Sequence, residues 1–191
     1  MSSIDLAGFS AKFAAEDDPW RTFSDRDEAV KREAILHALG AGPLGRVLEL
    51  ASGAGSNSAA LAPRALRLDA TEGTVEGTAL TARAIARWPR ARATEVPLPG
   101  RAPRVTYDAI VVAELLYYLT PRDMALVAHD VAGAARRGTM LVLAHHLVDF
   151  YDFAQHSAGI HQRFLKASGR FGRVRTIRRT SQWIVQSAIA R

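Results

Sequence analysis

A short apolar run that leads into a glycine turn, RVLELASGAGSN at residues 46–57, constrains the fold of this chain more than any other feature. Leu48 and Leu50 belong to a run typical of a strand that is covered on both faces, as in parallel α/β sheets. Gly53 and Gly55 permit positive φ angles and leave no Cβ between the backbone and a ligand. A helix that begins after them would point its N–H groups at that ligand. The segment therefore predicts a strand, a ligand-binding turn and a helix.

The spacing of the glycines limits the kind of ligand. A dinucleotide-binding fingerprint requires a third glycine near Ser58, and the chain has Ser56, Asn57 and Ser58 there. This difference argues against a nicotinamide or flavin dinucleotide. A nucleotide-like cofactor is still compatible with the turn.

A second predicted strand ends in an acidic residue. Apolar and polar residues alternate over residues 66–71, and Glu72 follows them, with Gly73 as a turn. A carboxylate at this strand end can accept hydrogen bonds from both ribose hydroxyls of an adenosine group. Asp69 is the rival for this role, but it lies within the strand on its polar face. We therefore predict that Glu72 binds the ribose.

Two further carboxylates accompany apolar runs. Glu49 interrupts the first strand near the carboxyl edge of the sheet, where we expect a role in chemistry rather than packing. Glu114 ends the almost unbroken apolar run at residues 109–113. Solvation alone does not explain a carboxylate at the edge where open α/β sheets bind ligands. The alternative for Glu114 is a buried acid that neighbouring backbone N–H groups satisfy.

Four motifs together point to a family. They are DPW at residues 18–20, the spacing of Glu28 and Lys31, VLELASGAG at 47–55 and YDAIVVAELLYYL at 107–119. Their order resembles that of the class I methyltransferases that use S-adenosylmethionine (SAM). Within that class, the chain resembles the nodulation protein S type of N-methyltransferase. The resemblance covers most of the chain.

The resemblance implies a fold and a cofactor. The fold is α/β, with a doubly wound, mostly parallel seven-stranded sheet and an antiparallel C-terminal hairpin strand. The cofactor is SAM, and the acid after the third strand, Glu95, would receive its adenine amino group while Val96 stacks near the ring. Tyr117 and Tyr118 would stand at the mouth of the cofactor cleft, on the substrate side. Trp20 either caps the sulfonium with its ring or anchors the N-terminal helix.

One residue departs from the family pattern. The family commonly has glycine where this chain has Ala51. Because alanine at positive φ is unfavourable, either the turn keeps φ negative there or cofactor binding is weakened. The full set of predicted cofactor-binding residues is Glu49, Ala51, Gly53, Gly55, Glu72, Gly73, Glu95, Val96 and Trp20.

The predicted reaction is methyl transfer to a small-molecule acceptor, most simply an amine nitrogen of an amino sugar or similar metabolite. Proximity supplies most of the acceleration, so whether a general base is needed stays open. The candidate catalytic residues are Glu114, His146 and His156, of which the resemblance favours the two histidines. The alternatives are an O-methyltransferase of a biosynthetic pathway and a SAM-binding or nucleotide-binding protein without catalysis.

Length and composition set limits on organisation and location. The chain has 191 residues, enough for one core, so we expect one domain over residues 1–191. Residues 1–40 would form a helical cap and residues 145–170 a substrate-side loop and helix. The chain has no cysteine, which fits a reducing cytoplasm and excludes thiolate chemistry. No segment is apolar enough to span a membrane, so we expect a cytoplasmic protein.

The net charge and the histidines raise two further possibilities, nucleic-acid binding and a metal site, and we expect neither. The net charge is +6, but Arg83, Arg87 and Arg90 have the spacing of one solvated helix face. No nucleic-acid-binding module accompanies the charge, so we do not expect nucleic acid as a partner. Adjacent histidines at 145 and 146 would point to opposite faces of a strand, which argues against a metal site. The oligomeric state is not determined by these patterns.

The remaining elements follow from local signals. Residues 25–39 have apolar positions at helical spacing, and the helix should end near Gly40. Thr120 and the proline after it predict the start of a second helix that runs towards Arg137 and ends at Gly138. A buried strand should follow at residues 140–144. The arginine-rich segment at residues 169–183 resembles an edge strand paired with the C-terminus.

Overall fold

The computed structural model describes residues 3–101, 103 and 105–191, and one sheet runs through this part of the chain. The order of its strands is β3-β2-β1-β4-β5-β7-β6. Neighbours from β3 to β5 are parallel, whereas β7 is antiparallel to both β5 and β6, which confirms the predicted fold class. The strands are β1 (Leu44–Leu50), β2 (Ala65–Glu72), β3 (Ala91–Glu95), β4 (Tyr107–Ala113), β5 (Ala135–His146), β6 (Phe171–Arg179) and β7 (Trp183–Ala190).

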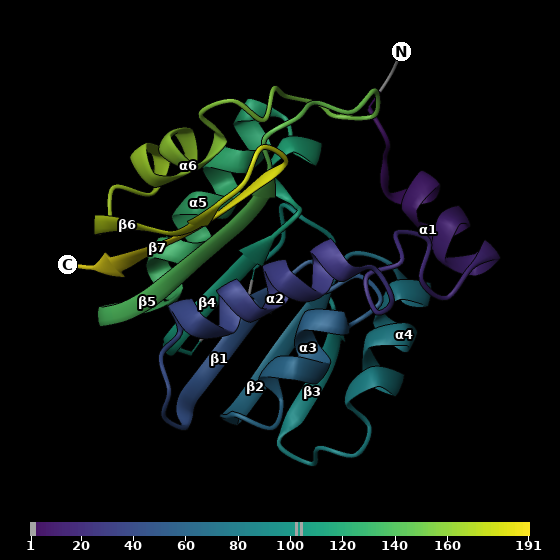
Figure 1. Ribbon diagram of the computed structural model, residues 1–191, viewed down its shortest axis with the longest axis horizontal. Helices are drawn as coiled ribbons and strands as arrows, with labels where there is room; N and C mark the ends of the chain where they lie inside the picture. The colour runs from purple at the N-terminus through teal and green to yellow at the C-terminus, as the bar shows by residue number, and fades with distance from the viewer. Residues whose placement is uncertain (1–2, 102, 104) are drawn as a thin grey trace.

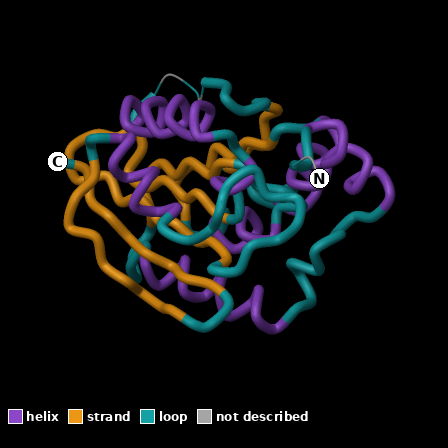
Figure 2. The backbone as a smooth tube through the Cα atoms, turned by 90° about the horizontal axis from the view of Figure 1, so that it is seen from above, coloured by secondary structure: helices purple, strands orange, loops and turns teal. Residues whose placement is uncertain are grey.

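Helices cover both faces of the sheet (Figure 1). On one face lie α2, α3 and α4, and on the other lie α5 and α6, so the strands are enclosed between two helical layers when seen from above (Figure 2). The short α1 packs beside α4 instead of on the sheet. The helices are α1 (Leu6–Ala15), α2 (Arg26–Ala38), α3 (Ser56–Leu61), α4 (Val75–Ile85), the 3₁₀ turn η1 (Leu116–Tyr118), α5 (Pro121–Ala134) and α6 (Ile160–Ser168).

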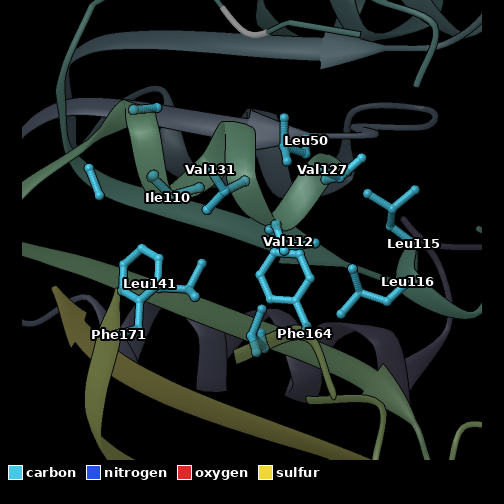
Figure 3. Close-up of a cluster of buried hydrophobic side chains, with 14 of the residues drawn as sticks. Leu50, Ile110, Val112, Leu115, Leu116, Val127, Val131, Leu141, Phe164 and Phe171 are labelled. Carbon is cyan, nitrogen blue, oxygen red and sulfur yellow. The ribbon is translucent and has the colours of Figure 1, made fainter. Parts of the chain in front are cut away.

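The hydrophobic core consists of two layers, one on each side of the sheet. Figure 3 shows the layer in which Ile110 and Val112 of β4 face Val127 and Val131 of α5. Residues next to them in sequence, such as Val111, pack in the opposite layer under α2. This alternation is what a strand with both faces covered requires, because successive side chains point to opposite sides. The prediction that the apolar runs form strands covered on both faces is confirmed.

The start of α5 agrees with the sequence prediction, but its end does not. The Thr120 side chain accepts a hydrogen bond from the N–H of Asp123 as the predicted cap. The helix then ends at Ala134, and Gly138 lies inside β5 with φ +86°. Tyr107 of β4 pairs with Ala135, and the Tyr107 carbonyl accepts from the Thr139 hydroxyl at 2.6 Å. These sheet contacts override the local helical tendency, so Gly138 belongs to a strand irregularity rather than to a helix end.

The other local predictions have mixed outcomes. The helix over residues 25–39 corresponds to α2, with Asp25 as its cap, and the C-terminal hairpin of β6 and β7 is confirmed with β6 at the sheet edge. The proposed helix face of Arg83, Arg87 and Arg90 is wrong in part, because α4 ends at Ile85, although all three side chains are exposed. None of the helices within the described residues has the length and apolar character that crossing a bilayer requires.

Candidate active site

A cavity of about 690 Å³ opens at the carboxyl ends of the parallel strands. Its floor is the turn after β1, the end of β2 and the turn after β4, and its roof is the N-terminal segment with the loop after β5. These two roof segments meet where the N–H of Ile4 donates to the carbonyl of Asp152 at 3.1 Å. Their approach above the sheet is visible in Figure 1. The cavity occupies the place where open α/β sheets bind ligands.

The turn after β1 presents backbone to the cavity. Gly53 lines the cavity with φ +60°, and a Cβ built there would approach the protein only at the Phe13 ring, at 3.9 Å. Gly55 has a different reason to be glycine, since a Cβ there would lie 2.9 Å from atoms of Thr81 and Ala84 in α4. Gly55 therefore permits the packing of α3 against α4. The backbone open to a ligand is that of Gly53.

Ala51 adopts the left-handed conformation with φ +51°. The alternative in which the turn keeps φ negative at this alanine is therefore wrong. Ala51 lines the cavity and holds this conformation although a side chain is unfavourable there. The second alternative, weakened cofactor binding, stays a prediction.

Glu72 lies at the end of β2 and lines the cavity. One carboxylate oxygen accepts the N–H of Gly53 at 2.9 Å, which joins the strand end to the glycine turn. Burial raises the pKa of Glu72, and the N–H groups of Gly53, Gly73 and Thr74 offset part of that increase. Gly73 also lines the cavity, and a Cβ there would lie 2.8 Å from Leu6 of the roof. Both residues therefore face the cavity at the end of β2, and the ribose-binding role of Glu72 stays a prediction.

Asp69 and Glu49 do not line the cavity. Asp69 is buried instead of lying on a polar face, and it accepts a hydrogen bond from the Tyr107 hydroxyl at 3.1 Å. Glu49 is buried beneath the turn and accepts from the Ser58 hydroxyl at 2.5 Å. Burial raises the pKa of Glu49 to about 8. Its position supports the turn from below, so the geometry does not favour direct contact with a cofactor.

Glu114 is the centre of a charged cluster at the cavity wall. Its backbone has φ +51°, and its Oε1 lies 2.5 Å from the Lys31 ammonium. Its Oε2 accepts a hydrogen bond from the Tyr117 hydroxyl and lies 3.7 Å from Nε2 of His146. Lys31 also pairs with Glu28 at 2.7 Å. The cluster contains two carboxylates and one ammonium, so it attracts a cation.

Lys31 is a residue whose role the sequence did not reveal. Its side chain is buried, with 3% exposed, although it is charged. Burial alone would lower the pKa of Lys31, but Glu114 and Glu28 more than compensate, and the pKa is raised. The spacing of Glu28 and Lys31 was a signal, since residues three apart share a helix face. The contact with Glu114 had no local signal, because 83 residues separate the two in sequence.

Aromatic side chains form much of the cavity wall. Tyr117 stacks on Phe153 with ring centroids 3.7 Å apart, and Tyr118 packs edge-on against Phe9 of α1 at 5.0 Å. Both tyrosines line the cavity, as the sequence suggested for the substrate side. Trp20 lines it as well and packs against Phe9 and Phe13 of α1. The structure therefore gives Trp20 the anchoring contacts and also places it in the lining of the cavity.

Besides Glu49 and Gly55, three more of the predicted residues lie away from the cavity lining. The His156 side chain is 87% exposed and its Nδ1 lies 2.6 Å from Asp149, so the geometry gives no support to a catalytic role. Glu95 ends β3 with an exposed side chain, and Val96 is half-buried beside it. The adenine contacts of Glu95 and Val96 stay predictions.

The histidines at the end of β5 point in opposite directions, as strand geometry predicts. His146 lines the cavity, whereas His145 is fully buried on the other face and binds backbone N–H groups after Glu114. Within residues 3–101, 103 and 105–191, no three potential metal-binding side chains of His, Asp or Glu come together.

The comparisons with known proteins decide the family. The model of the family described as nodulation protein S matches residues 9–134. The chain belongs to the nodulation protein S family. As a member of this family with the class I fold, it is a SAM-dependent methyltransferase.

Solved structures similar to this nodulation protein S family member share its fold over nearly the whole chain. The N-methyltransferase NodS from Bradyrhizobium japonicum WM9, in complex with S-adenosylhomocysteine (SAH), has 18% sequence identity and a TM-score of 0.84 over 96% of this chain and 97% of that one. A DhpI–SAH complex has 19% identity and a TM-score of 0.76 over 97% and 94%. A putative methyltransferase from Pseudomonas syringae has 22% identity and a TM-score of 0.73 over 87% and 100%. A search of curated proteins finds no match.

Proposed function

We propose that the protein binds SAM in the cavity above β1, β2 and β4 and transfers its methyl group to the nitrogen of a small amine, such as an amino sugar. The observation that carries the proposal is the carboxylate of Glu114, which lies in an aromatic-walled cavity next to His146. The structure of NodS with bound SAH supports the choice of cofactor.

The residues at the strand ends fit an adenosine group with a sulfonium. Glu72 offers a carboxylate to the ribose hydroxyls, and the open backbone at Gly53 allows close approach of the amino-acid part. Gly73 and Trp20 complete this side of the cavity. SAM supplies a methyl group on a positively charged sulfur, which leaves as a neutral thioether.

The charge of the cavity favours a cationic acceptor. The whole chain has a net charge of +6, yet the charged side chains that line the cavity are mainly acidic. Positive and negative groups in a partly enclosed site select ligands of opposite charge. The acidic lining residues are Asp5, Glu28, Glu72, Glu114, Asp123 and Asp152, whereas the ammonium groups are those of Lys12 and Lys31.

The cluster around Glu114 then performs two tasks. Lys31 and Tyr117 fix the two carboxylate oxygens of Glu114, so the side chain is oriented before the acceptor arrives. The carboxylate binds the acceptor ammonium and takes up or passes on the proton that must leave before the nitrogen lone pair can attack. His146 is the second group within reach of that proton. Phe150 and Tyr118 add aromatic surface to the same wall.

The test is methyl transfer from isotopically labelled SAM to matched pairs of acceptors, such as an amino sugar and the corresponding sugar. We expect labelled product from the amine, and a Glu114→Gln variant should lose about 100-fold in kcat while its affinity for SAH is unchanged. A Glu33→Gln variant is the control, since Glu33 is an exposed carboxylate of α2. Methylation of the hydroxyl compound alone would support O-methylation instead. SAH binding without any turnover would support a non-catalytic protein.

A further inference from the structure

Two buried histidines lie behind the wall of the cavity, on the opposite face of β5. His145 precedes His146 in β5, and His161 lies in the first turn of α6; their exposed fractions are 0% and 3%. His145 Nε2 accepts two backbone N–H groups, from Leu115 at 3.3 Å and from Leu116 at 3.1 Å. These N–H groups begin the turn that follows Glu114.

The hydrogen bonds allow only one tautomer for each of the two neutral histidines. Since Nε2 of His145 accepts, its proton lies on Nδ1 and is donated to Nε2 of His161 at 2.9 Å. The proton of His161 then lies on its Nδ1 and is donated to Oε1 of Gln186 at 2.8 Å. The amide nitrogen of Gln186 donates to the hydroxyl of Thr176 at 3.1 Å. The chain of contacts runs from the turn after β4 to the edge strand β6.

The turn that this chain of contacts supports carries reactive groups. Glu114 has positive φ, a conformation that is unfavourable for a residue with a side chain and persists only where the surroundings impose it. The N–H of Glu114 is bound by the carbonyl of Ala144, and the next two N–H groups are bound by His145. Tyr117 packs edge-on against the His145 ring, with centroids 5.4 Å apart. His145 thus lies directly beneath the turn that sets Glu114 and Tyr117.

We propose that His145 and His161 are positioning residues for methyl transfer: as a neutral pair with one fixed tautomer each, they hold the turn that aims Glu114 and Tyr117 at the acceptor. The proposal rests on the proposed function for its effect on rate, but the pair itself is defined by geometry alone. Burial lowers the pKa of His161 to about 4 and that of His145 well below its usual value, so both stay uncharged near neutral pH.

The first test separates positioning from packing through kinetics. We expect His145→Phe to lower kcat by about 30- to 300-fold, with the SAH dissociation constant within about threefold of the wild-type value. His145→Gln should recover part of the rate, because its side-chain oxygen can accept the same two N–H groups. A role in packing alone predicts the reverse order, since phenylalanine preserves the ring and glutamine does not. Equal loss of kcat and of SAH affinity in His145→Phe would overturn the proposal.

The second test does not depend on methyltransferase activity. Nitrogen-15 NMR of the histidine side chains in the full-length protein reports which ring nitrogen carries the proton, and we expect Nδ1–H for both His145 and His161. The amide protons of Leu115 and Leu116 should exchange faster in His145→Phe than in the wild type, with the β4 amides unchanged. An Nε2–H tautomer at His145, or unchanged amide exchange at both Leu115 and Leu116, would overturn the proposal. If the wild-type chain methylates no acceptor, the proposed function fails, and these two readouts still decide whether the pair holds the turn.

Discussion

Ala51 carries a Cβ in a backbone conformation that favours glycine, with φ +51°. We expect Ala51→Gly to raise the free energy of unfolding by about 0.5–1 kcal/mol, because relief of the left-handed strain exceeds the added entropy of the unfolded chain. Urea denaturation measures the change. The control is Ala60→Gly in α3, where helical backbone predicts a loss of about 0.5–1 kcal/mol. A loss of stability in Ala51→Gly as well would show that the conformation is not strained.

Glu49 links stability to pH with the opposite sign from an ordinary carboxylate. Its pKa is raised from 4.5 to about 8 by burial, so the folded state keeps the proton more tightly than the unfolded state. The stabilising contribution is full below pH 4.5 and is lost as pH rises through about 8. The urea midpoint of Glu49→Gln should therefore fall less than that of the wild type between about pH 5 and about pH 8. Parallel pH profiles of the two proteins would contradict the buried, protonated state.

At the scale of elements, Gly55 sets the distance between α3 and α4. Gly55→Ala and Gly40→Ala both place a Cβ at φ +88°, but only at Gly55 would that atom meet α4, whereas nothing lies within 4 Å of the Cβ at Gly40. We expect Gly40→Ala to lower the free energy of unfolding by about 1 kcal/mol, and Gly55→Ala to lower it by about 1–3 kcal/mol more. Chemical denaturation of the two variants measures the difference. Equal losses would mean that α3 and α4 do not depend on this close contact.

The elements whose signals are local could be predicted from the sequence. Glu72 and Glu114 were found because strand ends in a parallel sheet share one edge, and the apolar runs revealed where those strands end. The boundary at residues 134–138 was missed because pairing with Tyr107 decides it, and that partner lies far away in sequence. The relation of His145 to His161 was missed for the same reason. A signal existed, since a histidine on the core side of an apolar strand needs a hydrogen-bond partner.

At the scale of the whole molecule, two segments that are far apart in the sequence meet above the cavity. The N-terminal segment contacts the loop after β5, and both line the site together with the strand ends. We expect thermal unfolding in a single transition, and saturation with SAH at about 100 times its dissociation constant should stabilise the protein by about 2.7 kcal/mol. For a chain of this size the melting temperature should rise by about 5–10 °C. Separate transitions for the cap and the sheet would contradict the assignment of residues 1–191 to one domain.

Calorimetric titration of SAH into the wild type, Glu72→Gln and Glu33→Gln tests most directly whether Glu72 holds the cofactor. Glu72→Gln keeps a carbonyl oxygen for the N–H of Gly53 but loses the charge offered to the ribose, so the fold should persist. We expect saturable binding to the wild type and to Glu33→Gln, and an affinity about 10- to 100-fold lower for Glu72→Gln. Absence of binding to the folded wild type, or equal affinity for Glu72→Gln, would contradict the proposed cofactor site.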